Sequence, residues 1–334
     1  MHIAASTIRP TRRAVLACAL ALLAAGAGVE ARAQAWPSKP VRLIVPFPPG
    51  GPTDTASRII GQQLSDRLKQ PVLVENKPGA SGSIAAAQVA KTPGDGYTLM
   101  MLATPTLLAP HMYKRAGYDP IKDFVPVAGV YDLPIVMVVN PSAMPNVADV
   151  QQLVAHAKAR PGQLNYTSSG VGSFGHLSME LLKQLGGFDM QHIAYKGSAP
   201  AITDTIGGQV PMMYADLIAA LPHIRSGKLR AIGVGSPQRV SVVPDVKTVA
   251  EQGFRGFDAV SWGGLLAPAG TPAEVVQRVS KEVADILGDK DVQEKLLAAG
   301  AIASYQSPQQ LAARVKGDYE KWGKVIRDKD ISAE

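Results

Sequence analysis

Two glycine-rich turns constrain this chain more than any other feature of its sequence. The first spans residues 47–54, with Gly50 and Gly51 at its centre, and the second spans residues 168–176, with Gly170 and Gly172. Each follows an apolar run typical of a strand and precedes an amphipathic run typical of a helix. The first N–H groups of a helix have no intrahelical partner and lie at the positive end of its dipole. The sequence therefore predicts two turns that accept an anion.

The two turns lie in different halves of the sequence, so we expect them to face each other across a cleft between two lobes that closes on a small acid. The chain has 334 residues, of which 46% are hydrophobic. A chain of this length and composition can bury two cores more readily than one. A two-lobed binding protein is the prediction.

An export signal is predicted at residues 1–33. Basic residues precede an apolar run at residues 14–29, and the small residues Ala31 and Ala33 mark a cleavage site. The adjacent arginines Arg12 and Arg13 suit either the general secretory or the twin-arginine route, so both stay open. The only cysteine, Cys18, lies in the removed segment. The exported chain would then have no disulfide, cysteine nucleophile or thiolate metal site.

The order of predicted elements indicates an α/β fold. Strand-like and helix-like runs alternate over residues 41–104 as β-α-β-α-β, which is typical of a parallel sheet flanked by helices. Thr53 or Asp54 is placed to cap the first helix. Residues 104–120 are punctuated by proline, two strands follow at residues 125–131 and 135–140, and a second α/β series runs to residue 234.

A strand is predicted at residues 260–267, followed by three closing helices without strands of their own. We expect these helices, at residues 272–287, 292–299 and 308–326, to cover the first lobe. The predicted lobes are residues 34–133 plus 262–334 for lobe 1 and residues 134–261 for lobe 2. Crossover strands join them.

The sequence resembles three kinds of enzyme or cofactor site, and a simple binding turn is favoured over each. Gly170, Gly172 and Gly175 match a dinucleotide fingerprint, but no acidic residue ends the next strand. Ser169, Ser173 and His176 cluster as in a serine hydrolase, but lack the usual nucleophile elbow. The remaining histidines occur singly, without metal-ligand spacing. No cofactor or metal is predicted, and the absence of a dense basic run argues against a nucleic-acid partner.

Four further residues have both a functional and a structural interpretation. Asp54 either contacts a ligand or favours the first turn of its helix. Asp216 ends an apolar run, where a carboxylate needs hydrogen bonds or a polar ligand. Tyr195 and Trp262 either form cleft walls or pack in the core.

The ordered motifs resemble the Bug family, the substrate-binding proteins of tripartite tricarboxylate transporters. The likeness covers nearly all of the chain after the signal. It includes the motifs Val41–Phe47, Gly50–Asp54, Glu75–Ala80, Gly94–Tyr97, Ser168–Ser173, Tyr195–Pro200, Gly207–Val210 and Leu221–Ile224. So many matches in the same order are more specific than any single glycine pattern. The resemblance implies a monomeric periplasmic receptor of the type II-like two-lobed fold, with a mixed, mostly parallel sheet in each lobe.

The resemblance also implies a mechanism. Family members hold one ligand carboxylate between the two turns through main-chain N–H groups, hydroxyls and water, and deliver the ligand to inner-membrane transporter subunits. The chain departs from the common Phe-Asp-Asn pattern at Tyr214-Ala215-Asp216.

The expected ligand is a di- or tricarboxylate, hydroxy acid, acidic amino acid or aromatic acid, and no catalysis is expected. An orphan sensor and, less favoured, a serine hydrolase remain alternatives. The expected ligand-binding residues are Phe47, Pro49, Gly50, Gly51, Thr53, Asp54, Thr104, Thr106, Ser168, Ser169, Gly170, Ser173, Tyr195, Ala199, Asp216 and Trp262.

Overall fold

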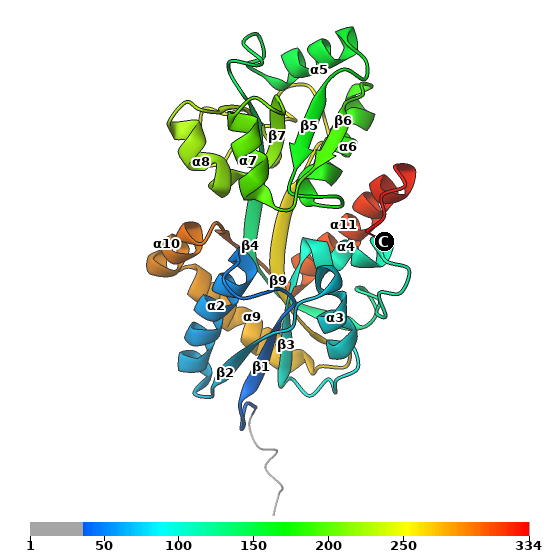
Figure 1. The fold of residues 1–334 in the computed structure, drawn as a ribbon. Coiled ribbons are helices and arrows are strands. Elements are labelled where there is room, and N and C mark those ends of the chain that lie inside the picture. Colours follow the sequence, from blue (N-terminus) through cyan, green and yellow to red (C-terminus); the bar gives the residue numbers. More distant parts are fainter. Residues whose placement is uncertain (1–35, 334) are drawn as a thin grey trace, which may run out of the picture. The chain divides into compact units, whose positions relative to one another are not determined.

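The computed structural model describes residues 36–333 (Figure 1). The predicted export signal and Cys18 lie outside these residues. The chain divides into two compact units, residues 1–38 and 39–334. Only residues 36–38 of the first unit are described, and they form no helix or strand. All elements below belong to the second unit. Within residues 36–333, no helix combines the length and apolar character needed to cross a membrane.

Lobe 1 is built on the strand order β2-β1-β3-β9-β4, with β10 on the other edge of β4. Strand β1 pairs in parallel with both β2 and β3, which confirms the predicted β-α-β-α-β unit. Strand β9 runs antiparallel to β3 and β4. The strands are β1 (Val41–Val45), β2 (Val72–Asn76), β3 (Thr98–Ala103), β4 (Phe124–Val139), β9 (Val260–Pro268) and β10 (Ile302–Gln306).

Lobe 2 continues the same sheet beyond β4. Strand β5 pairs in parallel with β6 and β7, while β7 and β8 both run antiparallel to the second half of β4. The strands are β5 (Asn165–Ser168), β6 (Gln191–Ala194), β7 (Met212–Asp216) and β8 (Arg230–Val234). The fold is therefore a mixed α/β sheet in two lobes.

Strand β4 serves both lobes. Its residues 124–134 pair with β9, and its residues 135–139 pair with β7 and β8. Pro134 lies where the partners change, and proline has no N–H to donate to a ladder. The two strands predicted at 125–131 and 135–140 are thus one strand. The prediction was wrong because Asp132, Leu133 and Pro134, which break the sequence pattern, still pair with β9. The lobe boundaries at 133/134 and 261/262 stay a prediction.

Helices cover both faces of the sheet (Figure 1). In lobe 1, α9, α10 and α11 pack on the sheet, as predicted for the closing helices, and α9 and α10 also pack on α2. The lobe 1 helices are α2 (Pro52–Leu68), the short 3₁₀ turn η1 (Ala80–Gly82), α3 (Ser83–Val89), α4 (Thr104–Met112), α9 (Ala273–Leu287), α10 (Lys290–Ala298) and α11 (Pro308–Asp328). The lobe 2 helices are α5 (Val150–Ala159), α6 (Phe174–Gly186), α7 (Ser198–Ile206) and α8 (Leu217–Arg225).

Two local elements were not predicted. Residues 104–112 form helix α4, because Pro105 falls in the first turn, where its missing N–H costs no hydrogen bond. Strand β10 lies between closing helices that were predicted to lack strands, because it pairs with β4, a partner distant in sequence.

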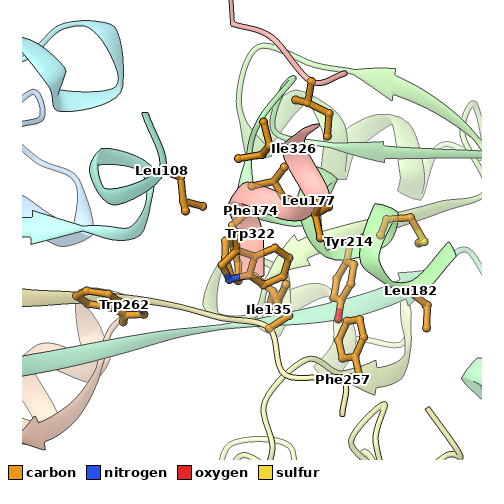
Figure 2. Packing of buried hydrophobic residues seen from close by; sticks show 14 of the residues in the cluster. Leu108, Ile135, Phe174, Leu177, Leu182, Tyr214, Phe257, Trp262, Trp322 and Ile326 are labelled. Atoms are coloured by element: carbon orange, nitrogen blue, oxygen red, sulfur yellow. The ribbon is translucent and has the colours of Figure 1, made fainter. Parts of the chain in front are cut away.

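One apolar core cluster runs from lobe 1 into lobe 2 (Figure 2). Phe174 of α6 and Trp322 of α11 meet edge to face, with ring centroids 4.8 Å apart. Leu177 and Ile326 belong to the same cluster. Helix α11 therefore packs against both lobes.

Candidate functional site

A cavity of about 550 Å³ is lined by both lobes and by the crossover strands. Its size suits a small organic ligand. The predicted first turn contributes Phe47 and Thr53, and the second contributes Ser169 and Ser173, so the two turns share one cavity. The full lining is Phe47, Pro52, Thr53, Ala103, Pro105, Leu133, Pro134, Ser169, Ser173, Phe174, Asp216, Leu217, Ile218, Ala219, Ser261, Ala298, Ala299 and Gly300.

Four helices begin at this cavity, where the sequence predicted two. Helices α2, α4, α6 and α8 each place residues of their cap or first turn in the lining. The caps of α2, α4 and α8, which are Gly51, Ala103 and Asp216, make no side-chain capping hydrogen bond. Pro52 and Pro105 have no N–H, so it is the N–H groups of the other first-turn residues that are left for solvent or a ligand. The positive ends of four helix dipoles converge on one space.

The charge of the lining side chains differs from that of a usual anion site. Within residues 36–333, no lysine, arginine or histidine lines the cavity, and Asp216 is the one ionisable residue that does. The remaining polar side chains are hydroxyls of Thr53, Ser169, Ser173 and Ser261. Any attraction for an anion must therefore come from main-chain N–H groups, helix dipoles and hydroxyls.

Asp54 stabilises the first turn through hydrogen bonds. Its carboxylate accepts hydrogen bonds from Gly50 N at 2.9 Å and Asn76 Nδ2 at 2.8 Å, and it pairs with Arg58 at 3.0 Å. Burial raises the pKa of Asp54, but the hydrogen bonds from Arg58, Gly50 and Asn76 outweigh burial and hold the pKa below its ordinary value. The prediction that Thr53 or Asp54 caps α2 was wrong. Gly51 is the N-cap, and the Asp54 side chain turns back to accept a hydrogen bond from Gly50.

Thr53 connects the first turn to the crossover strand. Its hydroxyl lies 2.8 Å from the hydroxyl of Tyr131 on β4, and both side chains are buried. Burial raises the pKa of Tyr131, so its hydroxyl keeps its proton and either oxygen can be the donor. The start of α2 is thereby fixed to the strand that joins the lobes.

A buried hydrogen-bond network holds the second turn. Ser173 Oγ donates to Ser168 Oγ at 3.0 Å, and Ser168 Oγ lies 2.8 Å from His192 Nε2 on β6. Gly172 N donates to His176 Nδ1 at 3.1 Å, so the ring of His176 holds the loop in place. Because Ser168 has no exposed surface, it supports Ser173, which does line the cavity.

The two histidines behind this turn stack in parallel. The ring centroids of His176 and His192 are 3.9 Å apart, with 12° between the ring planes. Burial, together with the nearby His176 and Lys183, lowers the pKa of His192 to about 3. Burial likewise lowers the pKa of His176. Both rings are therefore neutral at pH 7 and act as hydrogen-bonding and packing groups.

The hydroxyls of Ser169 and Ser173 and the imidazole of His176 do not form the triad of a serine hydrolase. Within the described chain, no hydrogen bond joins the ring of His176 to the hydroxyl of Ser169 or Ser173. The Ser168–His192 pair is the one serine–histidine side-chain contact of this turn, and Ser168 is fully buried. A substrate carbonyl cannot reach that hydroxyl. The geometry supports binding at this turn more than nucleophilic attack.

Several predicted contacts lie outside the lining. Thr104 Oγ1 accepts from Trp262 N at 2.8 Å and donates to Trp262 O at 3.2 Å, and Trp262 Nε1 donates to Asp318 at 2.7 Å. Thr106 donates to Ser81 O at 3.0 Å. The predicted residues that the structure places outside the lining are Pro49, Gly50, Gly51, Asp54, Thr104, Thr106, Ser168, Gly170, Tyr195, Ala199 and Trp262.

The remaining members of that group are loop, turn and helix-start residues. The hydroxyl of Tyr195 donates to Asp204, and Ala199 is exposed on α7.

Sequence reasoning missed part of the wall, including Pro105, Ile218, Ser261 and Gly300. Pro105 and Ile218 follow strand ends directly, as the predicted turns do, so the same signal could have identified them. Gly300 follows α10, and no local signal places it there.

Comparison with known proteins identifies the family of this chain. The model of the family described as "Tripartite tricarboxylate transporter family receptor" matches residues 56–331. Protein BugT of Bordetella pertussis is 36% identical over 306 residues, which cover 91% of this chain and 93% of BugT.

Two similar solved structures carry a bound acid in their names. R. palustris Rpa4515 with adipate is 36% identical, with a TM-score of 0.72, and the match covers 89% of this chain and 99% of that one. MatC (Rpa3494) from Rhodopseudomonas palustris with bound malate is 33% identical, with a TM-score of 0.69, over 87% of this chain and 100% of that one. The chain therefore belongs to the tripartite tricarboxylate transporter receptor family, the TctC or Bug group of periplasmic solute-binding proteins.

Proposed function

We propose that this chain is a periplasmic receptor that captures a small carboxylate between its two lobes and delivers it to inner-membrane transporter subunits. The observation that carries the proposal is the convergence of four helix starts on one cavity without a basic side chain. Helix N-termini and hydroxyls suit a carboxylate, which has two acceptor oxygens and a single charge. The similarity to proteins whose names include adipate and malate supports the same ligand class.

Closure of the lobes is a shift between two populated states. A carboxylate that contacts the start of α2 in lobe 1 and Ser169 and the start of α6 in lobe 2 gains all of these contacts only when the lobes approach each other. Its binding therefore favours the closed state. Capture requires no covalent step, cofactor or metal. The receptor works as a monomer after its export signal, residues 1–33, has been removed.

The proposal is tested with the purified chain and with cells. Native mass spectrometry identifies an acid that co-purifies, and a thermal-shift screen of small acids measures the rise in melting temperature that ligand binding produces. Calorimetry then gives the dissociation constant. Uptake of the same acid in cells that lack the gene tests delivery. We expect at least one small carboxylate to bind and its uptake to be lost. Binding of uncharged analogues with equal affinity would contradict the proposal.

A further inference from the structure

Asp216 is a carboxylate in the wall of a cavity proposed to bind carboxylates. It ends β7 and is the N-cap residue of α8, yet its side chain makes no capping hydrogen bond. Its Oδ2 accepts from the hydroxyl of Ser198 at 2.7 Å, and the residue is exposed. Its side chain brings one formal negative charge to the wall of the cavity. Its oxygens have lone pairs beyond the one that Ser198 uses, so it can accept further hydrogen bonds.

No cationic side chain among the described residues of the lining offsets this negative charge. No lysine, arginine or histidine lines the cavity in the described part of the chain, and the other polar side chains are hydroxyls. Two of those hydroxyls have partners elsewhere, since Thr53 bonds to Tyr131 and Ser173 donates to Ser168. Most of the remaining wall is apolar, with Phe47, Leu133, Phe174, Leu217 and Ile218 among its residues.

The charge of Asp216 discriminates between acids that differ only at the end away from their first carboxylate. The N-terminal ends of the helices bind the first carboxylate of any ligand. A second carboxylate would enter a space whose ionised side chain has the same sign and which offers no cation. An ammonium or hydroxyl group there would instead donate to Asp216. An unfavourable contact with the wrong ligand is a common source of specificity.

We propose, building on the carboxylate-binding function above, that Asp216 selects a small monocarboxylate whose other end is a hydrogen-bond donor, an ammonium or a hydroxyl, and disfavours dicarboxylates. The apolar wall accommodates a hydrocarbon body between the two polar ends. Asp216 is thus a specificity-determining residue of this chain. The starts of α2, α4 and α6 hold the acid that all such ligands share.

The test uses six-carbon acids that differ only at the far end. The probes are 6-aminohexanoate, 6-hydroxyhexanoate, hexanoate and adipate, and the dissociation constants are measured by calorimetry at pH 7. The matching four-carbon set covers a shorter ligand. The full exported chain binds at least one donor-bearing acid about tenfold more tightly than the dicarboxylate of equal length, the factor that 1.4 kcal/mol gives. The amino and hydroxy arms show which donor is preferred.

The Asp216→Asn variant supplies the decisive comparison. Asparagine caps helices as well as aspartate and keeps an oxygen for Ser198, so the fold is retained. The change removes one negative charge from the cavity. We expect the preference over adipate or succinate to fall about tenfold, with little change for hexanoate or butyrate. Asp245→Asn, an exposed residue outside the lining, is the matched control.

The outcomes separate this inference from the proposed function. If adipate binds the unmodified chain as tightly as 6-aminohexanoate, or if Asp216→Asn leaves the ratios unchanged, the role of Asp216 is overturned and carboxylate capture stands. If the simple acids bind but no donor-bearing acid of four or six carbons does, the inference also fails. If no acid of any kind binds, the carboxylate function itself fails.

Discussion

The ring of Phe174 meets the ring of Trp322 at 65° with 4.8 Å between centroids. Phe174 is the first residue of α6 and lines the cavity, while Trp322 belongs to α11 and is 1% exposed. The last helix of the chain therefore supports the start of a helix in the other lobe. Disturbing this pair should affect both the stability of the fold and the cavity.

Trp322→Ala should lower the free energy of unfolding by about 3 to 5 kcal/mol, because it removes a large buried side chain from a core shared by both lobes. Urea unfolding of the full chain measures the change. Trp322→Phe keeps an aromatic ring against Phe174 and should cost less. A loss below about 1 kcal/mol for the alanine variant would show that the contact contributes little.

A negative charge on either turn should abolish acid binding. Ser169→Asp places a carboxylate in the lining, where it repels the ligand, whereas Ser169→Asn changes the shape by a similar amount without adding charge. Gly50→Asp tests the other turn, with Gly50→Asn as its control because position 50 has a φ of +93° that asparagine tolerates better than most residues. Calorimetry measures affinity, and melting temperature confirms folding. Unchanged affinity in both aspartate variants would remove the turns from the site.

Thr53 and Tyr131 should behave as a coupled pair. Thr53→Val leaves the buried Tyr131 hydroxyl without its partner, so we expect a loss of about 1 to 3 kcal/mol in the free energy of unfolding. Tyr131→Phe added to Thr53→Val should recover part of that loss, since both polar groups are then gone. A double-mutant cycle by chemical denaturation gives the coupling. Additive effects would mean that the hydrogen bond contributes nothing.

The free energy of unfolding should fall as the pH is lowered, because His192 is neutral in the folded chain. Its pKa is about 3 in the fold and near 6.5 when unfolded, so the unfolded chain binds the proton more readily between those values. The stability is fully present above about pH 6.5 and is lost progressively as pH falls below it. Between pH 7.5 and 5.5 we expect a loss of about 1 kcal/mol, reduced because solvent reaches part of the ring.

His192→Gln should weaken this pH dependence, while His223→Gln on α8 serves as the control. Denaturant unfolding at both pH values measures the slope. His176 retains its own lowered pKa, so part of the dependence should remain in His192→Gln. An identical slope in His192→Gln and the unmodified chain would contradict the assignment.

The sequence predicted those features that depend on neighbouring residues. The parallel strands β1, β2 and β3 and the helices between them follow from local apolar patterns and turn residues. The two glycine-rich turns were expected to share a cavity, and Phe47, Thr53, Ser169 and Ser173 do line one. The order strand, turn, helix start is a local signal, and it was sufficient here.

Features that depend on distant partners were not predictable. Strand β10 forms because it finds an edge of β4 some 170 residues earlier in the chain. Trp262 was expected either in the cleft wall or in the core, and its indole N–H points to Asp318 on α11, which no local pattern indicates. Gly300 lines the cavity beside residues distant in sequence, since a β-carbon at that position would lie 3.8 Å from both Pro52 and Ile218, which belong to different lobes.

The continuity of β4 has a consequence for how the chain unfolds. Its residues 124–134 complete the sheet of one lobe and its residues 135–139 complete the sheet of the other. Neither lobe can lose this strand without opening the hydrogen-bond ladder of its neighbour. The two halves should therefore melt in a single cooperative transition, and a fragment cut at Pro134 should not be autonomous.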